Sequence, residues 1–134
     1  MSTTVKIRDE TTLNIGPGDD SGFLLEVPEE RITVRDLIRA RVYREVHDYN
    51  IDQPEYFHGL IQPSDAERSL NGFKMRKRRS IDPEKQFELA ERAFCTNGFI
   101  LLVDDRQVDE LEEKIEVRPD TTVTFLKLVP LVGG

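Results

Sequence analysis

Apolar and polar residues alternate near both ends of the chain, as they do in strands with one buried face. Val5 and Ile7 alternate with charged residues, and the apolar segment Phe23–Val27 follows a stretch rich in turn residues. Residues 122–129 alternate again, and Pro130 should end that strand because proline has no backbone N–H. We predict an opening antiparallel hairpin. If the last strand pairs with the first, it lies parallel to it in the middle of the sheet.

Two helices are predicted between these strands. Thr33 is a good N-cap for a helix over about 34–49. Asp82 and Pro83 begin a second helix over about 83–97, which Asn97-Gly98 should end. The first helix has a stripe of residues at helical spacing that should be buried: Val34, Leu37, Ile38, Val42, Val46 and Tyr49.

The remaining segments give shorter signals. The capping-box sequence at 64–67 predicts a short helix that ends near Leu70. The continuous apolar segment Phe99–Val103 predicts a strand covered on both faces. Gln107 and Val108 predict a short strand, and the spacing of Leu111 and Ile115 predicts one helical turn. The order of elements predicts an α+β fold, a mixed sheet packed on a helix, in a single domain over 1–134.

The formal net charge of −7 disfavours general binding to nucleic acid or to anionic membranes. Despite this negative charge, the chain contains one basic run at 74–79. The run is expected either to be a solvated loop or to dock an acidic partner or a nucleic acid. No apolar stretch has the length of a membrane span. Cys95 is the only cysteine, which fits a reducing compartment. We therefore expect a cytoplasmic protein.

Residues typical of catalysis are sparse. There is no glycine-rich phosphate loop, and His47 and His58 lack the spacing of metal ligands. Cys95 is expected to be a small buried thiol, and no pair of carboxylates stands out for acid–base work. We expect no catalytic residue, no metal site and no bound cofactor, and hence a protein on which other proteins act.

The end of the chain is the most specific feature. After the predicted strand, residues 130–134 form a flexible tail of three apolar residues and two glycines: Pro130, Leu131, Val132, Gly133 and Gly134. Glycine has no Cβ, so this tail can enter a narrow channel and present an unhindered carboxylate. If Val123 and Phe125 face the core, Leu126 and Leu128 face the other side of the sheet at the root of the tail. They form a docking patch there unless the second helix covers them.

These features resemble the ubiquitin-like β-grasp family over residues 3–50 and 98–134, in the prokaryotic branch of protein modifiers and sulfur carriers. The resemblance implies an insertion over 51–97, with a basic loop at 74–79 and an extra helix, between the first helix and the third strand. It implies that an activating enzyme adenylates the Gly134 carboxylate with ATP and magnesium. Gly133 and Gly134 would be the residues of adenylation and conjugation. Partners would recognise five apolar residues before them: Leu126, Leu128, Pro130, Leu131 and Val132.

The resemblance leaves three functions open. As a modifier, the chain is transferred, with the help of a conjugating enzyme, to target lysines through an isopeptide bond, which a JAB-type protease can remove. As a sulfur carrier, it bears a terminal thiocarboxylate. As a non-conjugated β-grasp binding module, its glycines have no chemical role. The modifier is our leading hypothesis.

Overall fold

The fold is α+β, with two helices and a mixed sheet, and the chain divides into two compact units. The computed structural model describes residues 2–11, 22–69 and 72–128. Unit 1 comprises Met1–Leu37 and Ala93–Gly134, and unit 2 comprises Ile38–Arg92. The division falls inside both helices. Unit 2 thus begins earlier than residue 51, where the insertion is expected, and the single domain and its insertion stay predictions.

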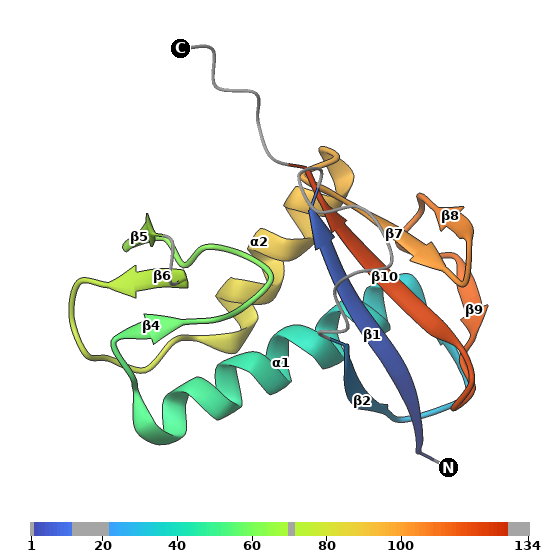
Figure 1. The fold of residues 1–134 in the computed structure, drawn as a ribbon, viewed down its shortest axis with the longest axis horizontal. Helices are drawn as coiled ribbons and strands as arrows, with labels where there is room; N and C mark the ends of the chain where they lie inside the picture. Colours follow the sequence, from blue (N-terminus) through green and yellow to red (C-terminus); the bar gives the residue numbers. More distant parts are fainter. Residues whose placement is uncertain (1, 12–21, 70–71, 129–134) are drawn as a thin grey trace. The chain divides into compact units, whose positions relative to one another are not determined.

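Unit 1 contains a five-stranded sheet in the order β2-β1-β10-β7-β8 (Figure 1). Its strands, in chain order, are β1 (Thr3–Thr11), β2 (Phe23–Val27), β7 (Phe99–Val103), β8 (Arg106–Val108) and β10 (Thr122–Lys127). The predicted opening hairpin is confirmed, since β1 and β2 pair antiparallel. The predicted position of the last strand is also confirmed, because β10 lies between β1 and β7 and runs parallel to β1.

The core of unit 1 includes alternate positions of these strands. Val5 and Ile7 on β1, and Val123 and Phe125 on β10, are fully buried. On β7 the pattern corrects our prediction of a strand covered on both faces. Phe99, Leu101 and Val103 are buried, whereas the two residues between them are only half-buried.

A two-stranded ribbon completes unit 1. Strand β3 (Arg31–Thr33) pairs antiparallel with β9 (Lys114–Glu116), with Ile32 opposite Ile115. Ile115 is therefore in a strand, and the predicted helical turn from Leu111 to Ile115 is wrong. The segment before β9 instead binds the start of the first helix, where the amides of Val34 and Arg35 donate to the carbonyls of Glu113 and Leu111. These bonds satisfy amides that a helix N-terminus leaves without intrahelical acceptors.

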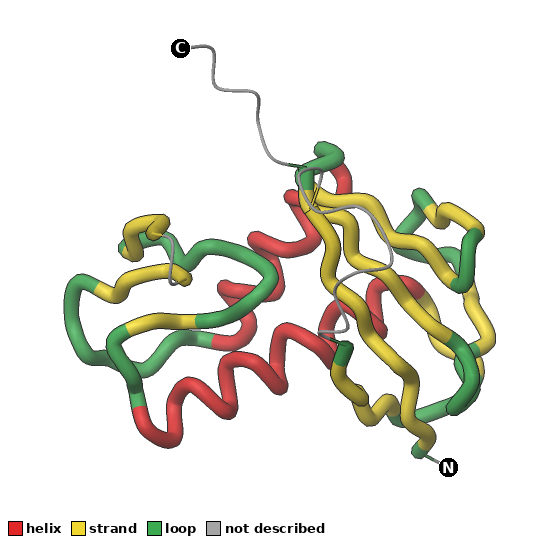
Figure 2. The backbone as a smooth tube through the Cα atoms, in the orientation of Figure 1, coloured by secondary structure: helices red, strands yellow, loops and turns green. Residues whose placement is uncertain are grey.

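Both predicted helices are present, as Figure 2 shows: α1 (Val34–Asp52) and α2 (Pro83–Cys95). The N-caps are as predicted, with the amide of Asp36 donating to Thr33 Oγ1 and that of Glu84 to Asp82 Oδ1. The six predicted positions of the buried stripe on α1 are all buried. At the end of α2, Asn97 adopts a positive φ of 60° and the amide of Gly98 donates to Ala93, as expected of a helix C-cap.

Unit 2 contains a three-stranded sheet in the order β4-β6-β5, formed by β4 (Tyr56–Phe57), β5 (Ala66–Ser69) and β6 (Gly72–Met75). The predicted helix over 64–70 is therefore wrong. Ala66 donates to the Pro63 carbonyl in a turn and then pairs with Met75 across β5 and β6. Gly72 begins β6 with φ of 118°, and a Cβ there would lie 2.9 Å from the His58 ring.

No helix among the described residues combines the length and the apolar character that a membrane-crossing helix needs.

Candidate functional site

The predicted site begins at the end of β10. Its outer members, Pro130, Leu131, Val132, Gly133 and Gly134, lie outside the described residues. Leu126 and Leu128 are described, and they define the root of the tail. Leu126 is half-buried on β10, and Leu128 is 36% exposed just after the strand. The docking role of both leucines stays a prediction.

Backbone hydrogen bonds hold the root in place beyond the end of β10. The amide of Leu128 donates to the Gly98 carbonyl at 3.3 Å, and the amide of Gly98 donates to the Ala93 carbonyl at 2.7 Å. A Cβ on Gly98 would lie only 3.2 Å from that Ala93 oxygen, so a larger residue would push these segments apart. The root is therefore fixed to the turn between α2 and β7.

The strand register extends the root into a larger surface. Leu126 lies opposite Ile100, and Thr124 lies opposite Leu102, so these side chains share one face of the sheet. That face is opposite the one where Val123 and Phe125 are buried. We call Ile100, Leu102, Leu126 and Leu128 the apolar band. Sequence reasoning missed Ile100 and Leu102, because a continuous apolar run does not show which residues face outward until its strand partner is known.

Polar residues lie next to the apolar band on β1. Arg8 is opposite Thr124 and Glu10 is opposite Leu126. The two charges form an ion pair, with Arg8 Nη2 at 3.1 Å from Glu10 Oε1. The pairing makes this border of the band locally neutral, and the band can therefore contact an apolar partner surface without leaving either charge unpaired.

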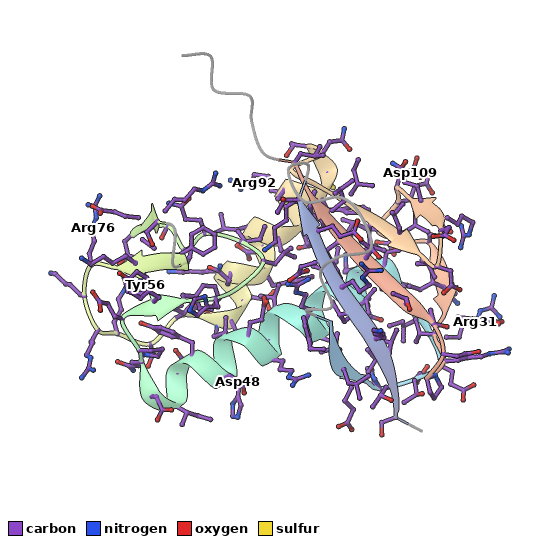
Figure 3. All side chains as sticks on the ribbon, viewed as in Figure 1. Arg31, Asp48, Tyr56, Arg76, Arg92 and Asp109 are labelled. Atoms are coloured by element: carbon purple, nitrogen blue, oxygen red, sulfur yellow. The ribbon has the colours of Figure 1, made fainter. Side chains whose placement is uncertain are left out.

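The basic run forms a second region of interest, in unit 2. Three of its cations pair with carboxylates: Lys74 with Glu55 at 3.8 Å, Arg76 with Glu67 at 3.5 Å, and Arg79 with Asp65. The exposed side chain of Arg76, labelled in Figure 3, follows directly after β6. The Arg79 guanidinium donates to the Asp65 carboxylate and lowers its pKa.

A charged cluster also joins α1 to α2 within unit 2. The Arg39 guanidinium lies 4.2 Å from the centre of the Phe87 ring and donates to Glu84 at 3.1 Å. The Tyr43 hydroxyl donates to the same carboxylate and thereby lowers the pKa of Glu84, while its own pKa is raised. Every polar group in this cluster has a partner, and we assign it to holding the two helices together.

The described residues contain no group of three or more His, Cys, Asp or Glu side chains arranged to hold a metal ion. Cys95 is exposed at the end of α2, so the expectation of a buried thiol is wrong. The expectations of no catalytic residue and no bound cofactor stay predictions.

The chain was compared with protein-family models, with curated proteins and with solved structures. No family model, no curated protein and no solved structure matches it.

Proposed function

We propose that this chain is a ubiquitin-like β-grasp protein that serves as a protein modifier. An activating enzyme uses ATP and magnesium to adenylate the Gly134 carboxylate, which releases pyrophosphate. A cysteine of a partner displaces AMP to form a thioester. A target lysine amine then displaces that thiol and forms an isopeptide bond.

The order of strands in unit 1 is the observation that supports this proposal most. A β-grasp sheet has two antiparallel pairs joined by a central parallel pair, and the order β2-β1-β10-β7-β8 is compatible with it. The central strand β10 leads directly toward the diglycine. On this proposal, unit 2 corresponds to the insertion and carries surfaces that a small family member lacks.

The apolar band gives the activating enzyme a surface to recognise. Leu126 and Leu128 lie at the root, and the hydrogen bond from Leu128 to Gly98 fixes their position. A firmly held root lowers the entropy cost of placing the tail in a channel, because fewer residues must be ordered on binding. The activating enzyme would therefore recognise the apolar band and the tail together.

The direct test is ATP–pyrophosphate exchange with a cognate adenylating enzyme. Deletion of Gly134 should abolish exchange. Leu128→Asp should lower kcat/KM by about tenfold, the effect of losing one well-packed contact of roughly 1.4 kcal/mol. Leu24→Ser is the matched control: Leu24 is 60% exposed on β2, and β1 separates it from β10.

The outcomes separate the three functions. Exchange followed by lysine-linked products supports the modifier. Exchange followed by replacement of a terminal oxygen by sulfur, without linked products, supports a sulfur carrier. If exchange is absent with every adenylating enzyme encoded nearby, both are refuted and a non-conjugated binding module remains. Equal losses for Leu128→Asp and Leu24→Ser would refute the specific role of the apolar band.

A further inference from the structure

We propose that Asn97 is a site of spontaneous deamidation, and that the hydrogen bonds at the root of the tail control how fast it reacts. In this reaction the backbone nitrogen of Gly98 attacks the side-chain carbonyl carbon of Asn97. The new N–C bond closes a succinimide ring, and the side-chain nitrogen leaves as ammonia. Water then opens the ring to aspartate or to isoaspartate. The inference does not depend on the proposed modifier function.

The sequence and the exposure of the site favour this reaction. Gly98 has no Cβ, so its nitrogen is the least hindered backbone nucleophile that can follow an asparagine. Asn97 and Gly98 are both exposed, and water can therefore reach the ring. Asn71 and Gly72 form the only other Asn-Gly pair in the sequence, within unit 2, and they provide an internal reference for the rate.

In the folded chain, the C-cap of α2 protects Asn97. This residue has a positive φ of 60°, and its amide donates to the Phe94 carbonyl at 3.2 Å. The amide of Gly98 donates to the Ala93 carbonyl at 2.7 Å. These are the two hydrogen bonds of a Schellman motif. The Gly98 nitrogen must lose its proton and turn toward the Asn97 side chain before it can attack, so the ring closes only after the cap opens.

Gly98 joins this cap to the root of the tail. Its carbonyl accepts from the amide of Leu128 at 3.3 Å. The next residue, Phe99, is buried and lies opposite Lys127 in the ladder between β7 and β10. Because Gly98 makes one hydrogen bond to each segment, we expect the cap and the root to open together.

Deamidation would loosen the root permanently. Isoaspartate carries the main chain through its side chain and inserts one extra carbon before Gly98. This insertion displaces the Gly98 amide from Ala93 and the Gly98 carbonyl from Leu128. Both products also place a carboxylate at the C-terminus of α2, where the helix dipole disfavours negative charge. An aged chain would therefore have a less firmly held root.

The test is the rate of deamidation of the whole protein at neutral pH. Trypsin releases Asn97 in the peptide 93–106 and Asn71 in the peptide 69–74. Mass spectrometry with fragmentation that separates isoaspartate from aspartate quantifies the products in both peptides. Asn97 in the folded protein should react at least about tenfold more slowly than in the free peptide 93–106, because the open state is a minor population.

Two substitutions of Leu128 isolate the hydrogen bond. Leu128→Pro removes the amide that donates to Gly98, whereas Leu128→Ala shortens the side chain and keeps the amide. Leu128→Pro should speed the reaction of Asn97 by about fivefold, the factor expected for loss of one backbone hydrogen bond. Leu128→Ala should leave the rate unchanged, and neither variant should change the rate at Asn71.

A second measurement uses the wild type, in case Leu128→Pro does not fold. In sub-denaturing urea, hydrogen exchange at the Leu128 amide and deamidation of Asn97 should rise in parallel. After ageing, the isoaspartate fraction should show faster exchange at Leu128. Asn97→Gly keeps a residue suited to a positive φ and cannot deamidate, so its exchange should not change on ageing.

Four results would refute the proposal. The first is a rate at Asn97 in the folded protein equal to that of the free peptide. The second is an equal rate for Leu128→Pro and Leu128→Ala. The third is an increase at Asn71 as large as that at Asn97, which would show opening of the whole chain. The fourth is an Asn97 that stays intact even in sub-denaturing urea.

Discussion

Replacing Asn50 by alanine should destabilise unit 2 specifically. The Asn50 side chain accepts from the Ile81 amide and donates to the Ile81 carbonyl, at 2.8 and 3.0 Å, in a part-buried position. Each hydrogen bond contributes about 1 kcal/mol net, and a buried backbone group left without a partner costs somewhat more. We therefore expect the free energy of unfolding to fall by about 2–3 kcal/mol.

The tyrosines provide a reporter that is selective for this unit. All three, Tyr43, Tyr49 and Tyr56, belong to unit 2, and the chain has no tryptophan. Urea unfolding followed by tyrosine fluorescence therefore measures unit 2, while far-ultraviolet circular dichroism measures the whole chain. The fluorescence midpoint should move to lower urea with an unchanged m-value.

Two further variants make the Asn50 experiment decisive. Asn50→Asp keeps an acceptor for the Ile81 amide but loses the donor, so its stability should fall between those of wild type and Asn50→Ala. His47→Ala is the control for helix propensity, since His47 is exposed on the same helix. The reasoning is refuted if Asn50→Ala unfolds within about 0.5 kcal/mol of His47→Ala, the scatter expected for surface substitutions.

Three other perturbations follow from single contacts. The Arg79 guanidinium holds the pKa of Asp65 below its usual 3.8. The interaction between the two side chains therefore stabilises the folded state above pH 3.8, and this stabilisation is lost as the pH falls through the lower pKa of the folded state. In this pH range, the loss of stability with falling pH, followed by tyrosine fluorescence, should be less steep for Asp65→Asn than for the wild type. Gly72→Ala should cost more than about 1 kcal/mol in urea unfolding, because φ is 118° and its Cβ would lie 2.9 Å from the His58 ring; a loss below 0.5 kcal/mol would contradict this. Phe125→Ala removes a fully buried ring from unit 1 and should cost about 3–5 kcal/mol by circular dichroism; a cost near 1 kcal/mol would contradict tight packing around β10.

The long elements could be predicted because several local signals agree in each. In α1, the Thr33 cap, the apolar stripe and the absence of an internal proline all favour a helix, and the structure extends it only from 49 to Asp52. The last strand combines alternation with a following proline. Its central, parallel position was predicted on the condition that it pairs with the first strand, and the structure shows that pairing.

The short elements could not be predicted because tertiary pairing decides them. Residues 64–67 match a helix cap, but the Asp65 side chain pairs with Arg79, fourteen residues further along the chain. Ala66–Ser69 then pairs with β6. Similarly, the spacing of Leu111 and Ile115 suits a helical turn, but Ile115 pairs with Ile32 from a distant strand. The preference of a four-residue motif for a helix is too weak to outweigh such tertiary contacts.

The members of the candidate site differ in the same way. Leu126 and Leu128 could be found from residue parity next to the diglycine. Ile100 and Leu102 could not, because the sheet face on which they lie becomes clear only from the pairing of β7 with β10.

The most direct measurement of the modifier proposal is mass spectrometry of tryptic peptides from cells that express this chain. Trypsin cleaves after Lys127, so a conjugate should leave the seven-residue branch Leu-Val-Pro-Leu-Val-Gly-Gly on a lysine of the target. We predict such branched peptides, joined through the Gly134 carbonyl to the lysine Nζ, and their loss when Gly134 is deleted. Recovery of this segment only as an unbranched peptide or as a thiocarboxylate, with the activating enzyme present, would contradict the proposal.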